Sequence, residues 1–156
     1  MINKNQKWIE SLHEGISLLN ETDQETLMKK AGISCVSDIL QLCESSLGHE
    51  IKTISDLING WNILRKSKGL KGGWQSNDLE ITGVFHECGC PLVRGKYVKL
   101  HPIQCLCSKG MIETIFSKVS QTNVKVEMKQ SIGNGDNMCE FKVILNGSSF
   151  SEKSGS

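Results

Sequence analysis

Two closely spaced pairs of cysteines are the residues of this sequence best suited to chemistry. Cys88 and Cys90 form the first pair, and after fourteen intervening residues Cys105 and Cys107 form the second. Four thiolates drawn from two such turns suit a zinc ion in a closed tetrahedral site, or an iron–sulfur cluster. We therefore predict a metal site made of these four cysteines, with zinc as the metal and an iron–sulfur cluster as the alternative.

The local structure expected around each pair decides how its thiols can act. In an extended segment, residues two apart project from the same face, so a strand ending near His86 would present Cys88 and Cys90 on one side. Cys105 and Cys107 fall where a helix is expected to begin, and the free backbone N–H groups and helix dipole favour a thiolate there. If the chain is an enzyme, one of these two thiols is the preferred nucleophile.

Several other residues are weaker candidates for the same site. His86 and His101 are the candidate bases, and His101 is also a fallback metal ligand. Cys139 opens a predicted strand, where packing against the sheet is favoured over ligation. Arg94 and Lys96 lie in the loop between the pairs and are able to hold an anion, although a solvated loop is the favoured interpretation.

Other interpretations of the cysteines stay open at this stage. Buried cysteines behave as small hydrophobic residues, so the pairs are alternatively part of the core without a shared site. A reactive thiol with nucleophilic or redox duty is the third interpretation. Cys35 and Cys43 lie on the apolar side of a predicted helix and are expected in the core. His13 lies on a helix rich in charged residues and is expected to be solvated.

Composition limits the class of protein and its partners. The chain has 156 residues, of which 38% are hydrophobic, which suits one domain with its own core. Its net charge is +1 and its cations are scattered, so neither a nucleic acid nor a membrane is expected as partner. No apolar stretch approaches the roughly 20 residues of a membrane span, and no signal-peptide core follows the polar start. We therefore expect a cytoplasmic protein, where seven cysteines indicate metal ligation, redox chemistry or catalysis rather than disulfides.

The first 72 residues have the spacing of apolar residues that is typical of helices. Helices are predicted over residues 8–19, 23–31 and 33–43, and over a fourth segment that begins after Thr53 or Ser55. Thr22 and Glu25 form a predicted capping box, and Gly48 is the predicted end of the third helix. Residues 70–73 then break the helical pattern.

The apolar face of the first helix has two interpretations. Trp8, Leu12, Ile16 and Leu19 recur at three- and four-residue spacing. Packing of this face on the domain's own sheet is favoured, and a homodimer through the N-terminal helices is the alternative.

The second half of the chain changes to a mixed pattern. Strands are predicted over residues 79–85, 124–128 and 139–145, and a helix over 111–119. Residues 133–136, Gly-Asn-Gly-Asp, strongly indicate a β-hairpin turn because glycine and asparagine tolerate positive φ. The sequence thus predicts one α+β domain over residues 1–146, with N-terminal helices packed on a small antiparallel sheet and a C-terminal β-hairpin. Its helical part is 1–72, its cysteine-rich part is 78–146, and the tail 147–156 is predicted to be disordered.

Three segments carry a resemblance to known families. Residues 135–143, GDNMCEFKV, resemble the closing motif of the 4-vinyl reductase domain, a family of predicted small-molecule-binding modules. Residues 88–93, CGCPLV, and 105–110, CLCSKG, resemble a cysteine-rich group, some of whose members are labelled L-2-amino-thiazoline-4-carboxylate hydrolase-like. No metal-hydrolase motif and no Ser-His-Asp order accompanies that label.

The resemblance covers roughly residues 80–146, and it implies both a fold and a ligand. The fold is the α+β arrangement of vesicle-tethering subunits, with a pocket between helices and sheet. The ligand is a small apolar or heterocyclic molecule, with zinc as a cofactor that the resemblance allows. Gly135, Asp136 and Cys139 match as structural turn residues, and the two cysteine pairs match as the site.

Together these observations predict a cytoplasmic domain that binds a metal or a small molecule through the doubled C-x-C motif, with a sensor as one role. The alternative is a hydrolase of a small cyclic amide or amidine, in which a thiolate or a zinc-bound water attacks the carbon. The sequence does not decide between a binding domain and an enzyme.

Overall fold

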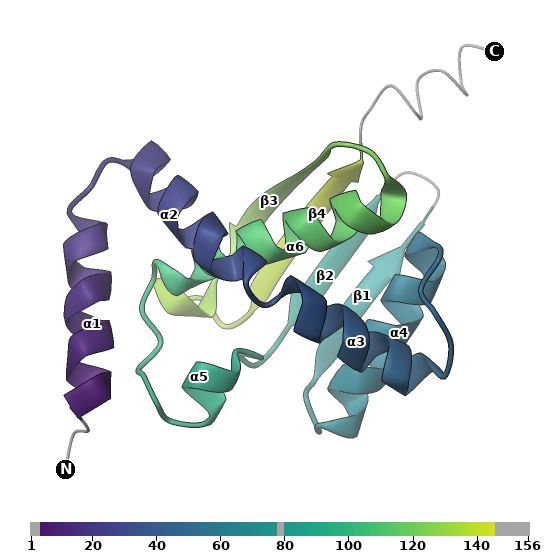
Figure 1. The fold of residues 1–156 in the computed structure, drawn as a ribbon, viewed down its shortest axis with the longest axis horizontal. Helices are drawn as coiled ribbons and strands as arrows, with labels where there is room; N and C mark the ends of the chain where they lie inside the picture. The colour runs from purple at the N-terminus through teal and green to yellow at the C-terminus, as the bar shows by residue number, and fades with distance from the viewer. Residues whose placement is uncertain (1–3, 78–79, 146–156) are drawn as a thin grey trace.

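The computed structural model describes residues 4–77 and 80–145, in which helices come first and strands follow (Figure 1). The first part consists of α1 (Lys4–Ser17), α2 (Glu21–Ile33), α3 (Val36–Leu47) and α4 (Ile54–Ser67). The second part consists of β1 (Gly72–Ser76), β2 (Ile81–Phe85), α5 (Pro91–Arg94), α6 (Gln104–Ser120), β3 (Val124–Gln130), the 3-10 turn η1 (Ile132–Asn134) and β4 (Cys139–Leu145). The predicted disordered tail, 147–156, lies outside the described residues. Within those described ranges, no helix has the length and apolar character needed to cross a bilayer.

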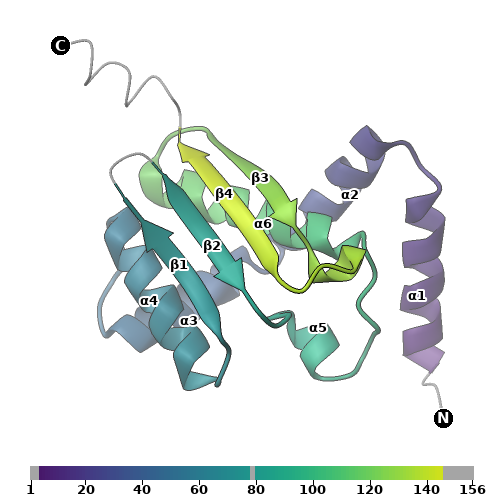
Figure 2. The same cartoon turned by 180° about the vertical axis from the view of Figure 1, so that it is seen from behind.

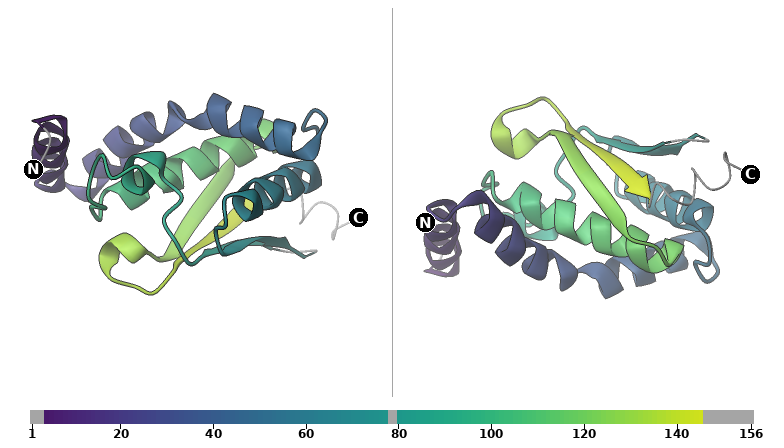
Figure 3. Two further views of the ribbon diagram at one scale, coloured as in Figure 1. Left: turned by 90° about the horizontal axis from the view of Figure 1, so that it is seen from below. Right: turned by 90° about the horizontal axis from the view of Figure 1, so that it is seen from above.

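The four strands form one antiparallel sheet in the order β1-β2-β4-β3. Figure 3 shows the helices layered on one face of this sheet, with α6 next to the strands and α2 outside it. The opposite face, turned towards the viewer in Figure 2, carries no helix of the described residues. Alternate residues of β2 are buried, as expected for a strand with one covered face. The predicted α+β class, with N-terminal helices on a small antiparallel sheet and a C-terminal hairpin, is confirmed.

Four aromatic rings fill the space between the helices and the sheet. The ring of Trp74 on β1 lies 5.4 Å from Trp61, 5.2 Å from Phe85 and 5.0 Å from Phe116, measured between ring centroids. Gly83 is the register partner of Trp74 on β2, and a Cβ at that position would lie 2.7 Å from the Trp74 ring. Glycine is therefore needed at position 83 so that this ring can cross the neighbouring strand.

Strand β1 was not predicted, because its glycines indicate a break. The structure forms it with the help of Asn62 on α4, whose side chain binds the backbone of Trp74 twice. The Trp74 N–H donates to Asn62 Oδ1 at 2.7 Å, and Asn62 Nδ2 donates to the Trp74 carbonyl at 2.9 Å. The amide thus binds the outward backbone groups of Trp74, which a further strand at this edge would otherwise pair with.

Helix α1 stands at one end of the molecule, away from the sheet (Figures 1 and 3). Its apolar residues Trp8 and Leu12 are 67% and 47% exposed, and Leu19, which follows the helix, is 42% exposed. The prediction that this face packs on the domain's own sheet is therefore wrong, and the homodimer stays a prediction. The one buried side chain of α1 among the described residues is His13, which was expected to be solvated.

The helix ends follow local hydrogen-bond chemistry. Thr53 caps α4 with a reciprocal capping box to Asp56, as one of the two predicted caps. Helix α3 ends at Gly48, whose φ of 90° is the left-handed conformation that favours glycine. Helix α2 begins earlier than predicted, because the side chain of Asn20 accepts a hydrogen bond from the Asp23 N–H at 2.9 Å. The Thr22–Glu25 capping box is therefore wrong.

Helices α2 and α6 pack at close range through two glycines. A Cβ on Gly32 would meet the backbone carbonyl of Cys107 and lie 3.0 Å from the backbone nitrogen of Met111. A Cβ on Gly110 would lie 2.6 Å from the Cα of Lys29. In both contacts backbone faces backbone, so neither helix can give way by turning a side chain.

Substitution of Gly32 by alanine should push α2 and α6 apart. We expect the free energy of unfolding to fall by about 1–3 kcal/mol, the usual cost of overpacking a tight contact. Urea denaturation followed by circular dichroism measures it. The matched control is Gly15→Ala in α1, where a Cβ meets nothing within 4 Å. That variant should lose no stability, since alanine is the better helix former, and an equal loss in both variants would contradict the close contact at Gly32.

Candidate functional site

Helix α6 places Cys105 in its first turn, at the edge of the core. The helix is anchored on its inner side by Ile112, Ile115 and Phe116, which are buried. Its start is fixed by Gln104, whose Oε1 accepts a hydrogen bond from the His101 N–H at 2.8 Å. Cys105 is itself only 5% exposed. The prediction that this cysteine lies at a helix start, where a thiolate is favoured, is confirmed for the position.

The connection between β3 and β4 surrounds the sulfur of Cys105 with hydrogen-bond donors. Ser131 Oγ donates to Cys105 Sγ at 2.7 Å. The backbone of Gly133 and the side chain of Cys139 also lie close to this sulfur, and both lower the pKa of Cys105. A Cβ on Gly133 would lie 2.6 Å from Cys105 Sγ, so only glycine lets the backbone approach so closely. We call Cys105, Ser131, Gly133 and Cys139 the thiolate nest.

The nest is held in shape by Asp136 and by a bulge in β3. Asp136 Oδ2 accepts from the Ser131 N–H at 2.8 Å, and the Asp136 N–H donates to the Ser131 carbonyl at 3.1 Å. The β3–β4 register shifts between Met128 and Gln130. Such a bulge turns the end of a strand, and here it carries the backbone towards α6. Ser131 is 1% exposed, so its hydroxyl is directed by this framework and not by solvent.

The nest separates the pKa values of its two thiols. The hydrogen bond from Cys139 lowers the pKa of Cys105 to about 6, against burial and with the help of Ser131 and Gly133. The same hydrogen bond raises the pKa of Cys139 far above its ordinary range, and burial adds to the effect. The first proton to leave the pair is therefore lost more readily than that of an ordinary cysteine, and the Ser131 hydroxyl favours the charge on Cys105.

Cys88 and Arg65 lie beside the nest. Burial raises the pKa of Cys88, and the neighbouring thiols of Cys90 and Cys105 add to this, while the Cys90 N–H and Arg65 oppose it. Arg65 is 7% exposed and its guanidinium lies 4.4 Å from the centre of the Phe85 ring. The positive charge of Arg65 favours the charged form of the neighbouring Cys88 thiol.

Cys107 lies on another side of α6. Residues two apart on a helix are turned by about 200° from each other, at about 100° per residue. Burial raises the pKa of Cys107 to about 12, and the adjacent thiol that adds most to this is Cys35, followed by Cys90 and Cys105. Cys107 is therefore a neutral thiol at physiological pH. The fully buried Cys43 is also neutral, since burial raises its pKa to about 12, and its predicted place in the core is confirmed.

The four cysteines of the predicted metal site are near one another but do not converge. Within residues 4–77 and 80–145, no three side chains of histidine, cysteine, aspartate or glutamate are arranged so that they could hold a metal ion. Strand β2 ends at Phe85, before the first pair, so Cys88 and Cys90 do not share a strand face. Zinc and the iron–sulfur cluster stay predictions.

The candidate histidines are engaged elsewhere. The ring of His101 lies 5.7 Å from that of His13, and its Nδ1 accepts a hydrogen bond from the Ile103 N–H at 3.2 Å. His86 is exposed after the end of β2. Burial lowers the pKa of His13, and His101 adds to the effect, so His13 is buried in its neutral form. In the part of the chain that the structure describes, neither His86 nor His101 hydrogen-bonds a cysteine.

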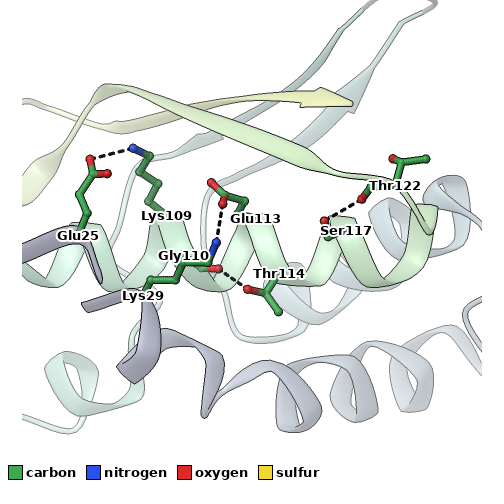
Figure 4. Close-up of polar contacts among 8 residues, drawn as sticks. All are labelled: Glu25, Lys29, Lys109, Gly110, Glu113, Thr114, Ser117 and Thr122. Carbon is green, nitrogen blue, oxygen red and sulfur yellow. Dashed lines mark hydrogen bonds and ion pairs between the residues drawn. The ribbon is translucent and has the colours of Figure 1, made fainter. Parts of the chain in front are cut away.

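A groove between α2 and α6 is a separate feature of the surface. It encloses about 220 Å³. Figure 4 shows its polar side chains pointing towards one another: Lys109 binds Glu25 at 3.1 Å, and Lys29 binds Glu113 at 2.7 Å. Each of these four charges is thus matched by an opposite charge on the facing helix. The pairs join the two helices and leave no unpaired charge among them for an ionic ligand.

Sequence reasoning named Cys105 and Cys139 but missed the groups that distinguish them. Ser131 and Arg65 were not singled out, and Gly133 was assigned to a turn alone. The one available signal was the glycine-rich connection before Cys139, which indicates a tight turn without indicating what it encloses. Arg94 and Lys96 are exposed, as expected, but Arg94 is the last residue of α5 and does not lie in a loop.

Comparison with known proteins gives a family and a fold. The model of the "Family of unknown function (DUF6144)" matches residues 1–150. No curated protein matches the chain. Among solved structures, the trafficking protein particle complex subunit 3 from Naegleria fowleri, covalently bound to palmitic acid, is 17% identical with a TM-score of 0.55. The match covers 91% of this chain and 90% of that one.

A second similar structure is the phenol-responsive sensory domain of the transcription activator PoxR, with phenol. It is 13% identical with a TM-score of 0.55, and the match covers 99% of this chain and 82% of that one. At these identities the likeness shows a shared fold. It supports the predicted resemblance to vesicle-tethering subunits at the level of fold.

The Cys105 thiol should titrate far below an ordinary cysteine. We expect a step in thiolate ultraviolet absorbance at about pH 6, rising with pH, that is absent in Cys105→Ser. Ser131→Ala removes one donor and leaves the burial, so its step should move to higher pH. Cys35→Ser, outside the nest, should keep the step unchanged. A low-pH step that survives in Cys105→Ser would assign the thiolate to another cysteine.

Proposed function

The chain belongs to the family of unknown function DUF6144, and from its own geometry we propose that it is a small-molecule-binding domain whose ligand contacts the Cys105 thiolate. The observation that carries the proposal is the hydrogen bond from Ser131 Oγ to the buried Cys105 Sγ at 2.7 Å, with the backbone of Gly133 against the same sulfur. Buried charges are costly, and a structural core cysteine is neutral, as Cys43 is. A thiolate built at this cost is typical of sites where a ligand or substrate meets the sulfur.

The ligand class that suits a thiolate is a small electrophile. A thiolate is the nucleophilic form of cysteine, and it attacks carbonyl or other electron-poor carbon atoms. The donors around Cys105 stabilise its negative charge before a ligand arrives, so contact with the ligand needs no proton transfer first. We propose that covalent capture is available to the ligand of this site.

The two structural neighbours agree with a small ligand without naming it. One is covalently bound to palmitic acid and the other is responsive to phenol, by their own descriptions. A shared fold alone does not transfer a ligand. In this chain, Trp61, Trp74, Phe85 and Phe116 fill the layer between helices and sheet. This packing favours a short ligand at Cys105 over a long acyl chain.

Zinc ligation by Cys88, Cys90, Cys105 and Cys107 is the second candidate. It is favoured by the electrostatic proximity of these thiols, which influence one another's pKa. Elemental analysis of protein purified without chelator tests it. About one zinc per chain, lost when Cys88 and Cys90 are both replaced by serine, would support this candidate over the free thiolate, whereas iron with a brown colour would indicate the iron–sulfur cluster.

The hydrolase alternative needs a base that moves a proton at the thiol. The nest supplies a serine hydroxyl and a second thiol, and His101 is bound to Ile103 instead. We therefore place binding before catalysis in the proposal.

Iodoacetamide, a small electrophile, tests the proposed site directly. Near neutral pH we expect Cys105 to be alkylated roughly tenfold faster than any other cysteine, because an ordinary thiol is only a few per cent thiolate. Peptide mapping of the folded protein after short exposure measures this. Cys35→Ser should leave the rate at Cys105 unchanged. Uniformly slow labelling of all seven cysteines in native, metal-free protein would contradict the proposal.

Native mass spectrometry extends the test from the thiolate to its ligand. Protein purified from its cells under native conditions should carry an additional mass that Cys105→Ser lacks. Equal masses for both proteins, each equal to the bare chain, would limit the site to a reactive thiol without a resident ligand.

A further inference from the structure

Cys105 and Cys139 belong to different elements but lie against the same turn. Cys105 lies in the first turn of α6 and Cys139 is the first residue of β4. Ser131 Oγ donates to Cys105 Sγ at 2.7 Å, and the N–H of the next residue, Ile132, donates to Cys139 Sγ at 3.4 Å. The two sulfurs are therefore held at consecutive residues of one turn. Neither sulfur has to cross a packed layer to reach the other.

The two sulfurs are chemically unequal, which assigns them an order of reaction. Cys105 Sγ accepts a short hydrogen bond from the Ser131 hydroxyl at 2.7 Å, and the backbone of Gly133 lies against the same sulfur. Cys139 Sγ accepts a longer hydrogen bond from the Ile132 N–H at 3.4 Å, so a negative charge is better stabilised on Cys105. Cys105 is therefore the nucleophile in a first step, and Cys139 remains as a thiol for a second. A cysteine with a stabilised negative charge beside a second cysteine is the arrangement found in redox-sensing pairs.

The burial of the pair limits the oxidant by size. Cys105 is 5% exposed, whereas Cys139 is half-buried. A protein disulfide is too bulky to reach Cys105 in the folded chain. Hydrogen peroxide or a short alkyl hydroperoxide is about as large as a few water molecules and carries no charge that burial would penalise.

We propose that Cys105 and Cys139 are a hydroperoxide-reactive pair that closes to an intramolecular disulfide. In the first step the Cys105 sulfur attacks the terminal oxygen of the hydroperoxide. The S–O bond forms, the O–O bond breaks, and the departing oxygen takes a proton from solvent to give water or an alcohol. Cys105 is then a sulfenic acid, its sulfur oxidised by two electrons and the peroxide reduced by two.

In the second step the Cys139 sulfur attacks the sulfur of Cys105. The S–S bond forms, the S–O bond breaks, and the hydroxyl leaves as water with the Cys139 proton. The sum is two thiols and one hydroperoxide giving one disulfide, one water, and one further water or alcohol. The product no longer contains the thiolate, so oxidation would also remove the group that the proposed ligand contacts. The inference uses the same thiolate as the proposed function but needs no ligand.

The test treats fully reduced protein with a stoichiometric amount of hydrogen peroxide and maps its peptides without reduction. We expect a Cys105–Cys139 disulfide as the main product. In Cys139→Ser, which keeps a hydroxyl donor towards Cys105, the reaction should stop at the sulfenic acid, trapped by dimedone on Cys105. Cys35→Ser, outside the pair, should give the same disulfide as the unaltered chain.

The outcomes separate this inference from the proposed function. If iodoacetamide selects Cys105 but peroxide yields no disulfide, or yields one between other cysteines, the pair is overturned and the thiolate site stands. If peroxide closes the pair but no ligand mass depends on Cys105, the redox pair stands and the binding function falls. The peptide map of the unaltered protein tests for the Cys105–Cys139 disulfide even where a variant fails to fold.

Discussion

The burial of α6 between the sheet and α2 is the constraint on which the rest of the structure depends. Its inner side places Phe116 and Ile115 in the aromatic layer, where both are fully buried. Its outer side meets α2 at the close contacts of Gly32 and Gly110. A helix held on both sides cannot slide or roll without opening one of these contacts. The position of α6, and so of Cys105, is therefore set by the core, and the His101–Gln104 hydrogen bond fixes where its first turn begins.

The same residue type has three outcomes in this fold, and local surroundings decide among them. Cys43 is buried among apolar side chains and is a neutral core residue. Cys107 is half-buried beside other thiols, which also disfavour its charge. Cys105 is more deeply buried, yet it accepts a hydrogen bond from Ser131 Oγ and lies close to Gly133 and Cys139. Burial alone would raise its pKa, so the donors supply the whole of the opposite effect.

Local signals in the sequence predicted most of the elements, because capping and periodicity act over a few residues. Thr53 and Gly48 mark helix ends that the structure contains. The strand at Trp74 was missed because its strand character depends on Asn62, a partner on another element. The first helix was misplaced because amphipathic spacing does not specify a partner. His13, whose charged neighbours in sequence suggested solvent, is covered by His101 from a distant segment.

The candidate site also combines features that depend on nearby residues with features that depend on distant ones. The position of Cys105 at a helix start could be predicted from the sequence, because a helix start depends on neighbouring residues. The Ser131 hydroxyl that defines its chemistry was not, because Ser131 reaches Cys105 only through the β3 bulge and the turn held by Asp136. The sequence therefore located the thiol but could not rank it above the other cysteines.

The C-x-C spacing shows why the metal and thiolate interpretations compete for one conformation. A strand would direct both thiols of such a pair to one face, whereas a helix turns them about 200° apart. The second pair is helical, with Cys105 towards Ser131 and Cys107 towards Cys35. For zinc to bind both, the first turn of α6 would have to unwind, and Cys105 would lose its hydrogen bond from Ser131. The interactions that stabilise the Cys105 thiolate therefore oppose the four-cysteine metal site. The chain can form the thiolate site or the metal site, but not both at the same time.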